Sequence, residues 1–117
     1  MFDAALLRHH PERQQLWPKL ARKCGYNAGK LARICGLSLR QLERYFEEDY
    51  GRSPCDWLKE QRMIAARFVL RETKSVKGTA LQLGYKQESL FCKSFKSCYG
   101  ITPTRMLDIH LQLLRRP

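Results

Sequence analysis

Residues 31–58 read LARICGLSLRQLERYFEEDYGRSPCDWL, and residues 79–107 read TALQLGYKQESLFCKSFKSCYGITPTRML. The second stretch repeats the first at an offset of 48 residues up to Gly84 and of 49 residues beyond it. The chain therefore contains two copies of one short structural unit. The matched pairs are Ala32 and Ala80, Gly36 and Gly84, Leu42 and Phe91, Phe46 and Phe95, Gly51 and Gly100, Pro54 and Pro103, and Leu58 and Leu107.

The first part of each copy predicts a short helix. It begins near residues 27–28 in one copy, and Ser75 is a suitable N-cap in the other. Each helix is expected to end at a glycine, Gly36 or Gly84, because glycine adopts positive φ without a steric penalty. A tight turn should follow at both glycines.

The second part of each copy predicts another helix, over about 39–49 and about 88–99. Two helices joined by a short turn that holds glycine form a helix-turn-helix unit, whose second helix lies in the DNA major groove. The expected buried stripes are Leu42, Phe46 and Tyr50 in the first copy and Phe91, Phe95 and Cys98 in the second.

The face opposite each stripe, taken at 100° per residue, is polar and mostly basic. Arginine reads guanine through two parallel hydrogen bonds, and serine and lysine reach base edges or phosphates. Glu43 can accept a hydrogen bond from cytosine, whereas Glu47 and its acidic neighbours are expected to face solvent or basic groups. Basic residues on both outward faces favour DNA over a merely solvated surface. These outward residues are Arg40, Glu43, Arg44 and Glu47, then Ser89, Cys92, Lys93 and Lys96.

A longer helix is predicted over residues 53–72, SPCDWLKEQRMIAARFVLRE, with Ser53 as its N-cap and Pro54 in its first turn. About 19 residues at 1.5 Å each give a rod of about 28 Å. Neighbouring major grooves are about 34–36 Å apart, so one subunit can reach both if the DNA bends toward it. Apolar residues expected to touch both halves are Trp57, Leu58, Ile64, Ala65, Phe68 and Val69.

The ordered motifs LARICGLS, LERYF, GRSPxxWL, RxxxAxxVL, LGY, FxxxFK and YGITP resemble the DNA-binding domain of AraC/XylS-type transcription regulators. The resemblance covers about 80 residues, from Ala28 to Leu107. It implies an all-α fold of about seven helices, with two helix-turn-helix subdomains joined by a long linker helix. It also implies sequence-specific binding to promoter DNA, usually with activation and with RNA polymerase as a further partner. Carried over position by position, it implies base reading by Arg40, Glu43, Arg44, Glu88, Ser89, Cys92 and Lys93.

The chain is expected to divide into an N-terminal helical extension (1–26), a first helix-turn-helix (27–52), the linker helix (53–73) and a second helix-turn-helix with a C-terminal helix (74–117). The last helix should run from Pro103 to about residue 114. The extension is too short for a ligand-sensing domain, so the chain is either a stand-alone binder or one domain of a longer regulator. Residues expected to close the second core are Met106, Leu107 and Leu111.

The N-terminal extension predicts one or two helices packed on the first unit. Pro11 and Pro18 interrupt its pattern, and Pro18 fits the first turn of a short helix that ends at Gly25. The apolar residues expected to pack are Phe2, Leu6, Leu7, Leu16, Trp17, Leu20 and Ala21.

The net charge of +11 favours a polyanionic partner, and binding to DNA should weaken steeply with salt. Lys77, Lys86 and Lys96 are the candidate phosphate contacts. A basic amphipathic surface also suits anionic membranes, but polar residues interrupt every apolar stretch, so neither a membrane span nor a signal peptide is expected. We expect the protein to act in the cytoplasm, at the nucleoid, as a monomer on double-stranded DNA.

Five cysteines without a CxxC spacing argue against a disulfide scaffold and a zinc site. Cys92 points partly outward, where Lys93 and Lys96 could lower its pKa and make it redox-sensitive. No catalytic set, phosphate-binding loop or cofactor motif is present, so neither an enzyme nor a cofactor is expected. The alternative function is a helical adaptor that grips an acidic protein partner. The cysteines expected to fill packing positions are Cys24, Cys35, Cys55 and Cys98.

Overall fold

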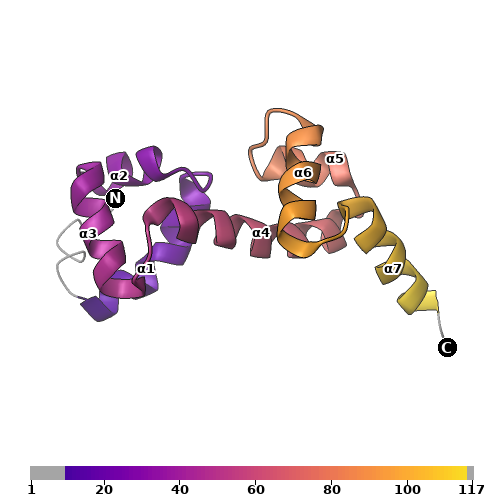
Figure 1. Cartoon of the computed structure of the whole chain (residues 1–117), viewed down its shortest axis with the longest axis horizontal. Helices are drawn as coiled ribbons and strands as arrows, with labels where there is room; N and C mark the ends of the chain where they lie inside the picture. The colour runs from indigo at the N-terminus through magenta and orange to yellow at the C-terminus, as the bar shows by residue number, and fades with distance from the viewer. Residues whose placement is uncertain (1–9, 116–117) are drawn as a thin grey trace. The chain divides into compact units, whose positions relative to one another are not determined.

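The computed structural model describes residues 10–115, which form helices joined by short turns and contain no strand (Figure 1). The prediction of an all-α fold with about seven helices is confirmed. No helix within this described range is long and apolar enough to cross a membrane. The helices are α1 (His10–Lys23), α2 (Ala28–Cys35), α3 (Leu39–Tyr50), α4 (Pro54–Thr73), α5 (Val76–Gln82), α6 (Glu88–Tyr99) and α7 (Pro103–Arg115).

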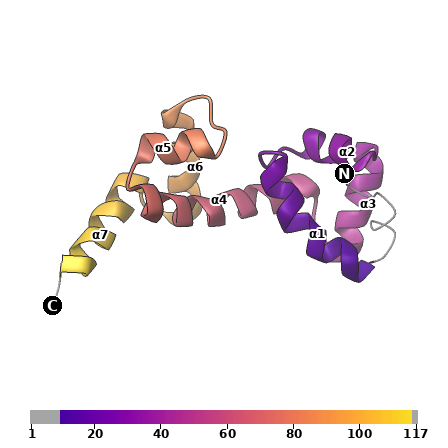
Figure 2. The same ribbon diagram turned by 180° about the vertical axis from the view of Figure 1, so that it is seen from behind.

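The helices divide into two compact units, Met1–Gln61 and Arg62–Pro117. The first unit contains α1, α2, α3 and the start of α4, and the second contains the rest of α4 with α5, α6 and α7 (Figure 2). The helix α4 therefore contributes side chains to both cores.

Aromatic side chains from three helices form the centre of the first unit. Trp17 of α1 packs on Phe46 of α3, with ring centroids 4.6 Å apart, and Phe46 packs on Trp57 of α4 at 5.2 Å. Tyr50, which is half-buried, stacks on Trp57 at 5.1 Å. Aliphatic residues and two cysteines complete this core: Leu20, Ala21, Cys24, Leu31, Ala32, Cys35, Leu42 and Leu58.

A row of aromatic rings lies along α6 in the second unit. The centroids of Phe91 and Phe95 are 5.7 Å apart, Phe91 contacts Tyr85 at 5.4 Å, and Phe95 contacts Tyr99 at 4.7 Å. Residues from α4, α5 and α7 cover this row: Met63, Ala66, Leu70, Ala80, Leu83 and Leu107 are buried. Met106 and Leu111 are half-buried at its edge.

The helix starts follow the predicted capping residues. Asn27 accepts a hydrogen bond from the Lys30 amide at 2.9 Å, and Ser75 accepts one from the Gly78 amide at 2.9 Å. Ser53 likewise accepts from the Asp56 amide at 3.2 Å. Such caps satisfy amides that have no partner within the helix, which explains why short helices begin at these residues.

Glycine in the left-handed region follows both first helices of the repeat. Gly36 has φ +68° and directly caps α2. Gly84 has φ +80°, but α5 ends at Gln82 with Leu83 as its cap, so this helix ends before the expected glycine and Gly84 lies one residue after the cap.

The predicted break at Pro18 is wrong. Pro18 lies inside α1, which continues from His10 to Lys23 as one helix. Proline removes one amide donor, but Pro18 is on the exposed side, while Trp17, Leu20 and Ala21 bury the other side and hold the helix across it. The expected contacts of Phe2, Leu6 and Leu7 lie outside the described residues.

Two side chains of α4 that were expected in the cores are exposed. Ile64 is 54% exposed and Phe68 is 68% exposed, whereas Ala65 and Val69 are half-buried. The buried residues of this half of α4 are Met63, Ala66 and Leu70, because the second unit packs on one narrow side of the helix.

The cysteines also divide differently from the prediction. Cys24 and Cys35 are buried as expected, but Cys55 and Cys98 are exposed. Cys98 lies three residues after Phe95, and the aromatic row continues instead through Tyr99, which turns Cys98 outward.

Candidate nucleic-acid interface

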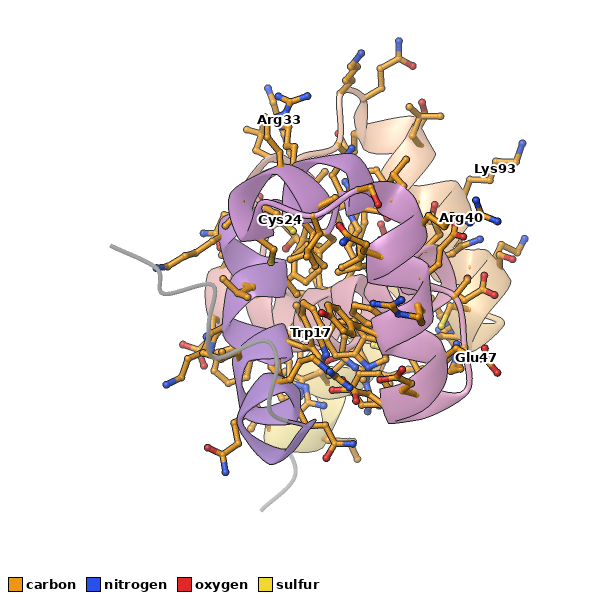
Figure 3. The ribbon with its side chains drawn as sticks, turned by 90° about the vertical axis from the view of Figure 1, so that its left-hand side faces the viewer. Trp17, Cys24, Arg33, Arg40, Glu47 and Lys93 are labelled. Carbon is orange, nitrogen blue, oxygen red and sulfur yellow. The ribbon has the colours of Figure 1, made fainter. Side chains whose placement is uncertain are left out.

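The second helix of the first unit, α3, has a buried side and a polar exposed side. Leu42 and Phe46 are completely buried, and Arg40, Glu43 and Arg44 are exposed. The three exposed residues follow the i, i+3, i+4 spacing, so they lie on one face of the helix. Figure 3 shows Arg40 projecting from the outer side of α3, while Trp17 lies inside the unit. The structure therefore brings the three predicted residues of this copy together on an accessible surface.

The second helix of the second unit, α6, has the same two-sided arrangement. Phe91 and Phe95 are completely buried, and Glu88, Ser89 and Lys93 are exposed. Figure 3 shows Lys93 extending away from α6 into solvent. These exposed positions match those of the first unit, since Ser89 and Lys93 occupy the places of Arg40 and Arg44 in the repeat.

Cys92, between these residues, is only half-buried, and its surroundings do not favour a thiolate. Burial, followed by the nearby Glu88 carboxylate, raises the pKa of the Cys92 thiol above its ordinary value. This is opposite to the lowering expected from Lys93 and Lys96. The raised pKa does not favour the redox role considered for Cys92, because a protonated thiol is a poor nucleophile.

The three lysines expected to contact phosphates are all exposed. Lys77 lies in α5, Lys86 in the turn between α5 and α6, and Lys96 in α6. None of them forms an ion pair with a carboxylate among the described side chains, those of residues 13–114.

A buried ion pair connects α1 to the C-terminal end of α3. The Arg13 guanidinium donates from Nε to Asp49 Oδ2 at 2.8 Å and from an Nη to Asp49 Oδ1 at 2.6 Å. Trp17 Nε1 also donates to Asp49 Oδ2, at 2.7 Å. The side chains of Arg13 and Asp49 are 3% and 0% exposed. The pair links α1 to the helix that carries the exposed arginines, and loss of either partner would leave a buried charge without compensation.

The environment keeps Arg13 charged. Its hydrogen bond to Asp49 is the main reason that the pKa of Arg13 lies above its ordinary value. The same guanidinium contacts Glu48 at 3.1 Å and lies 4.4 Å from the centre of the Tyr45 ring. Glu48 and Asp49 therefore accept from a basic group, as expected, and Glu47 is exposed.

In the second unit, Arg62 of α4 holds the turn between the two repeat helices. Its Nε and an Nη donate to the carbonyl oxygen of Leu83 at 3.1 and 2.8 Å. Its guanidinium also lies 3.7 Å from the centre of the Tyr85 ring. Arg62 thus fixes the residues on both sides of Gly84, from which the chain enters α6.

Two further hydrogen bonds position the ends of this helix pair. Tyr99 at the end of α6 donates its hydroxyl to the carbonyl oxygen of Met63 at 2.7 Å. The buried Thr79 hydroxyl donates to the Ser75 carbonyl at 2.7 Å, so this polar group in the core is satisfied. The Tyr99 bond holds α6 against α4. The link from α5 to α4 is a contact of 3.1 Å between the hydroxyl oxygens of Thr79 and Thr73, the last residue of α4.

The sequence did not reveal the residues that position these surfaces. Arg13, Asp49 and Arg62 act on residues far away in the chain, and no local spacing predicts such pairs. Leu39 and Leu90, which are exposed in the first turns of α3 and α6, were also given no role. In the sequence, each leucine stands directly beside a residue predicted to read bases, Leu39 beside Arg40 and Leu90 beside Ser89. This position was the signal that could have identified them.

Comparison with known proteins gives an independent view of the chain. The family model described as a helix-turn-helix domain matches residues 31–108, which include both copies of the repeat. No solved structure matches the chain significantly.

Three relatives illustrate this similarity. An uncharacterized HTH-type transcriptional regulator from Haemophilus influenzae is 35% identical over 77 residues, which are 65% of this chain and 26% of the relative. The virulence regulon transcriptional activator VirF from Yersinia enterocolitica is 32% identical over 82 residues, 69% of this chain and 30% of VirF. The HTH-type transcriptional regulator ExsA from Pseudomonas aeruginosa is 29% identical over 101 residues, 86% of this chain and 36% of ExsA. The chain thus spans about a third of the length of these relatives or less.

Proposed function

This chain belongs to the AraC/XylS-type family of helix-turn-helix transcription regulators, and from that membership we propose that it binds specific sequences of double-stranded promoter DNA. In this proposal α3 and α6 are the recognition helices, and each enters a major groove of the same duplex. The alternative of a protein adaptor without DNA binding is not favoured by relatives that are named as transcriptional regulators.

One observation carries the proposal most strongly. Each recognition helix is held from behind by two completely buried residues, and each exposes a basic residue at the same place in the repeat, Arg44 in α3 and Lys93 in α6. A helix that is fixed by a core and exposes a basic face is what entry into a major groove requires.

The proposed roles follow from side-chain chemistry. Arg40 and Arg44 read guanine, while Glu43 accepts from a cytosine amino group. Ser89 and Lys93 bond to base edges in the second groove, with Glu88 and Cys92 beside them. The exposed Leu39 and Leu90 can contact thymine methyl groups. Sequence preference is proposed to come from these side chains.

Lys77, Lys86 and Lys96 are proposed to bind phosphates, which sets the position of the second unit on the duplex without reading its sequence. We propose that one chain binds both grooves as a monomer, at the nucleoid in the cytoplasm. Activation of transcription through contact with RNA polymerase is the corresponding regulatory role, because VirF is named as a transcriptional activator.

Selection of bound duplexes from a random pool tests this function. We expect enrichment of a sequence with two conserved blocks about one helical turn apart, 10–10.5 base pairs from centre to centre. Arg44→Ala should weaken binding to the selected duplex by about 1–3 kcal/mol and relax the preference in one block, and Lys93→Ala should do so in the other.

Lys19→Ala is the matched control, because Lys19 is an exposed cation of α1 outside both recognition helices. It removes the same charge and should leave the base preference unchanged. Flat enrichment of the pool would contradict the proposed function. An Arg44→Ala variant with unchanged affinity and preference would contradict the role given to α3.

A further inference from the structure

The second unit contains a groove that none of the proposed DNA-contacting residues lines. It lies between the C-terminal half of α4 and α7 and has a volume of about 300 Å³. Its floor and one wall are mainly apolar, formed by Leu70, Met106, Leu107, Ile109 and Leu113, with His110 of α7 as a further lining residue.

The exposed wall of the groove is a row of apolar side chains along α7. Met106, Ile109 and Leu113 follow a spacing of three and four residues, which places them on one face of the helix. Leu113 is 61% exposed, and Ile109 is exposed as well. Isolated apolar residues are common on protein surfaces, but a row of them beside a groove is typical of an interaction site.

The α4 wall of the groove carries two positive charges, Arg67 and Arg71, one helical turn apart. Both side chains are exposed, and neither forms an ion pair with a carboxylate in the described part of the chain. The Arg67 guanidinium is 5.4 Å from the centre of the Tyr99 ring, which keeps it close to the unit. The groove therefore combines an apolar floor with unneutralised cations on one edge.

The apolar floor of the groove and the two arginines at its edge together distinguish between possible ligands. A DNA backbone would neutralise the arginines but would leave Ile109 and Leu113 in water. A volume of about 300 Å³ is at the lower limit for small-molecule sites, and the exposed Leu113 leaves this groove open. An acidic amphipathic helix is complementary to both the floor and the edge of the groove. Its apolar side chains fill the floor, and its carboxylates pair with the arginines.

We propose that the groove between α4 and α7 binds an acidic amphipathic helix of a partner protein. Large apolar residues of that helix, spaced i, i+3 or i+4, and i+7, contact Met106, Ile109 and Leu113. Its acidic residues lie against Arg67 and Arg71. This binding is separate from DNA recognition and gives the second unit a second ligand.

The experiment is a display selection of random 16-residue peptides against the whole chain, with depletion on the Leu113→Glu variant. We expect the enriched peptides to share large apolar residues at helical spacing, flanked by Asp or Glu. One such peptide, labelled with a fluorophore, is then titrated with the whole chain and followed by anisotropy. Arg71→Glu and Leu113→Glu should each weaken its binding at least tenfold.

Leu81→Glu is the matched control, since Leu81 of α5 is a similarly exposed leucine outside the groove, and it should leave binding within twofold of the parent. Circular dichroism checks that each variant is folded. The proposal is overturned if no enriched peptide depends on the groove, if basic peptides are enriched, or if Leu81→Glu weakens binding equally. It is also overturned if the neutral change Leu113→Ala weakens binding to the selected DNA duplex, because the groove would then belong to the DNA surface.

Discussion

The two units present the same pair of helices but hold them by different polar contacts. In the first, a buried carboxylate, Asp49, receives hydrogen bonds from Arg13 and Trp17. In the second, the positioning groups Arg62 and Tyr99 donate to backbone carbonyl oxygens. The first unit thus depends on the oppositely charged pair Arg13 and Asp49. The second depends on backbone carbonyl oxygens, which every residue carries.

The two recognition helices also differ in the hydrogen bonds at their first turns. Ser38 and Gln41 form a capping box at the start of α3, with hydrogen bonds of 3.1 and 3.0 Å. At the start of α6, Gln87 makes no capping hydrogen bond with its side chain. The two copies therefore share the apolar positions that define the helix pair. The hydrogen bonds that cap and position the helices differ from one copy to the other.

The largest effect expected from this difference is the loss of the charge pair. Arg13→Ala leaves Asp49 buried without its cation, and breaking such a pair destabilises a protein by about 3–5 kcal/mol. Both tryptophans of the chain, Trp17 and Trp57, lie in the first unit, so urea unfolding followed by tryptophan fluorescence reports on it. The control Arg22→Ala removes an exposed arginine from the same helix and should have little effect. An equal decrease in the free energy of unfolding in both variants would show that the buried pair contributes no more than an exposed arginine does.

Removal of the corresponding arginine in the second unit should cost less. Arg62→Ala leaves a neutral carbonyl without its donor, and a hydrogen bond to a charged group contributes about 1.5–3 kcal/mol. We expect faster amide hydrogen exchange in α5 and α6, whereas Arg71→Ala, on the same helix, should leave exchange unchanged. If Arg62→Ala destabilised its unit as strongly as Arg13→Ala does, the distinction between charged and neutral acceptors would fail.

The opposite charges at one position of the repeat give a third test. Glu47 of α3 corresponds to Lys96 of α6, and both side chains are exposed. Lys96→Ala should lower the slope of log affinity against log salt concentration by about one, because one phosphate contact is lost. Glu47→Ala should leave the slope undiminished. Equal reductions in both variants, measured on the selected duplex, would contradict the proposed phosphate role of Lys96.

The smallest expected effect concerns the cysteines, which also differ between the units. Among the described residues, the buried thiols are Cys24 and Cys35, and both lie in the first unit. Burial raises the pKa of Cys35 from 9.0 to about 11. The unfolded thiol ionises at its ordinary value, so this contribution to stability is present below about pH 9 and is lost as the pH rises toward 11. We expect Cys35→Ala to lose less stability than the parent over this range.

Alkylation with iodoacetamide at pH 8 provides the matching kinetic measurement. Cys55 and Cys98 are exposed and should react quickly, while Cys24 and Cys35 should react only when the first unit opens. Mass spectrometry of the digested protein identifies the modified residue. Rapid modification of Cys35 in the folded protein would contradict its burial.

The sequence predicted the helices well because their determinants are local. Ser75 caps its own helix, and the apolar spacing of Phe91 and Phe95 is set within one turn. The expected helices over 39–49 and 88–99 agree with α3 and α6 to within one residue. The predicted exposure of Arg40, Arg44 and Lys93 followed directly from these anchors.

The errors arose where distant residues decide the outcome. Ile64 and Phe68 are apolar, but whether they are buried depends on which side of α4 another helix covers. Pro18 satisfies a local rule for helix starts, yet the packing of Trp17 carries the helix past it. The pairing of Arg13 with Asp49 joins residues 36 positions apart, and no local pattern contains it. The division of the chain at 1–26, 27–52, 53–73 and 74–117 stays a prediction, and so do the base-reading and phosphate-binding roles.

The sharing of α4 also determines how the protein can be cut experimentally. Trp57 and Leu58 are buried in one core, and Met63, Ala66 and Leu70 are buried in the other, within a single uninterrupted helix. A gene cut between Leu58 and Met63 leaves each fragment its own core residues of α4, whereas a cut at any other point between Trp57 and Leu70 removes core residues from one fragment. A cut between Leu58 and Met63 still divides α4 and removes its backbone hydrogen bonds there, so each half expressed by itself should be most stable with a complete copy of residues 54–73.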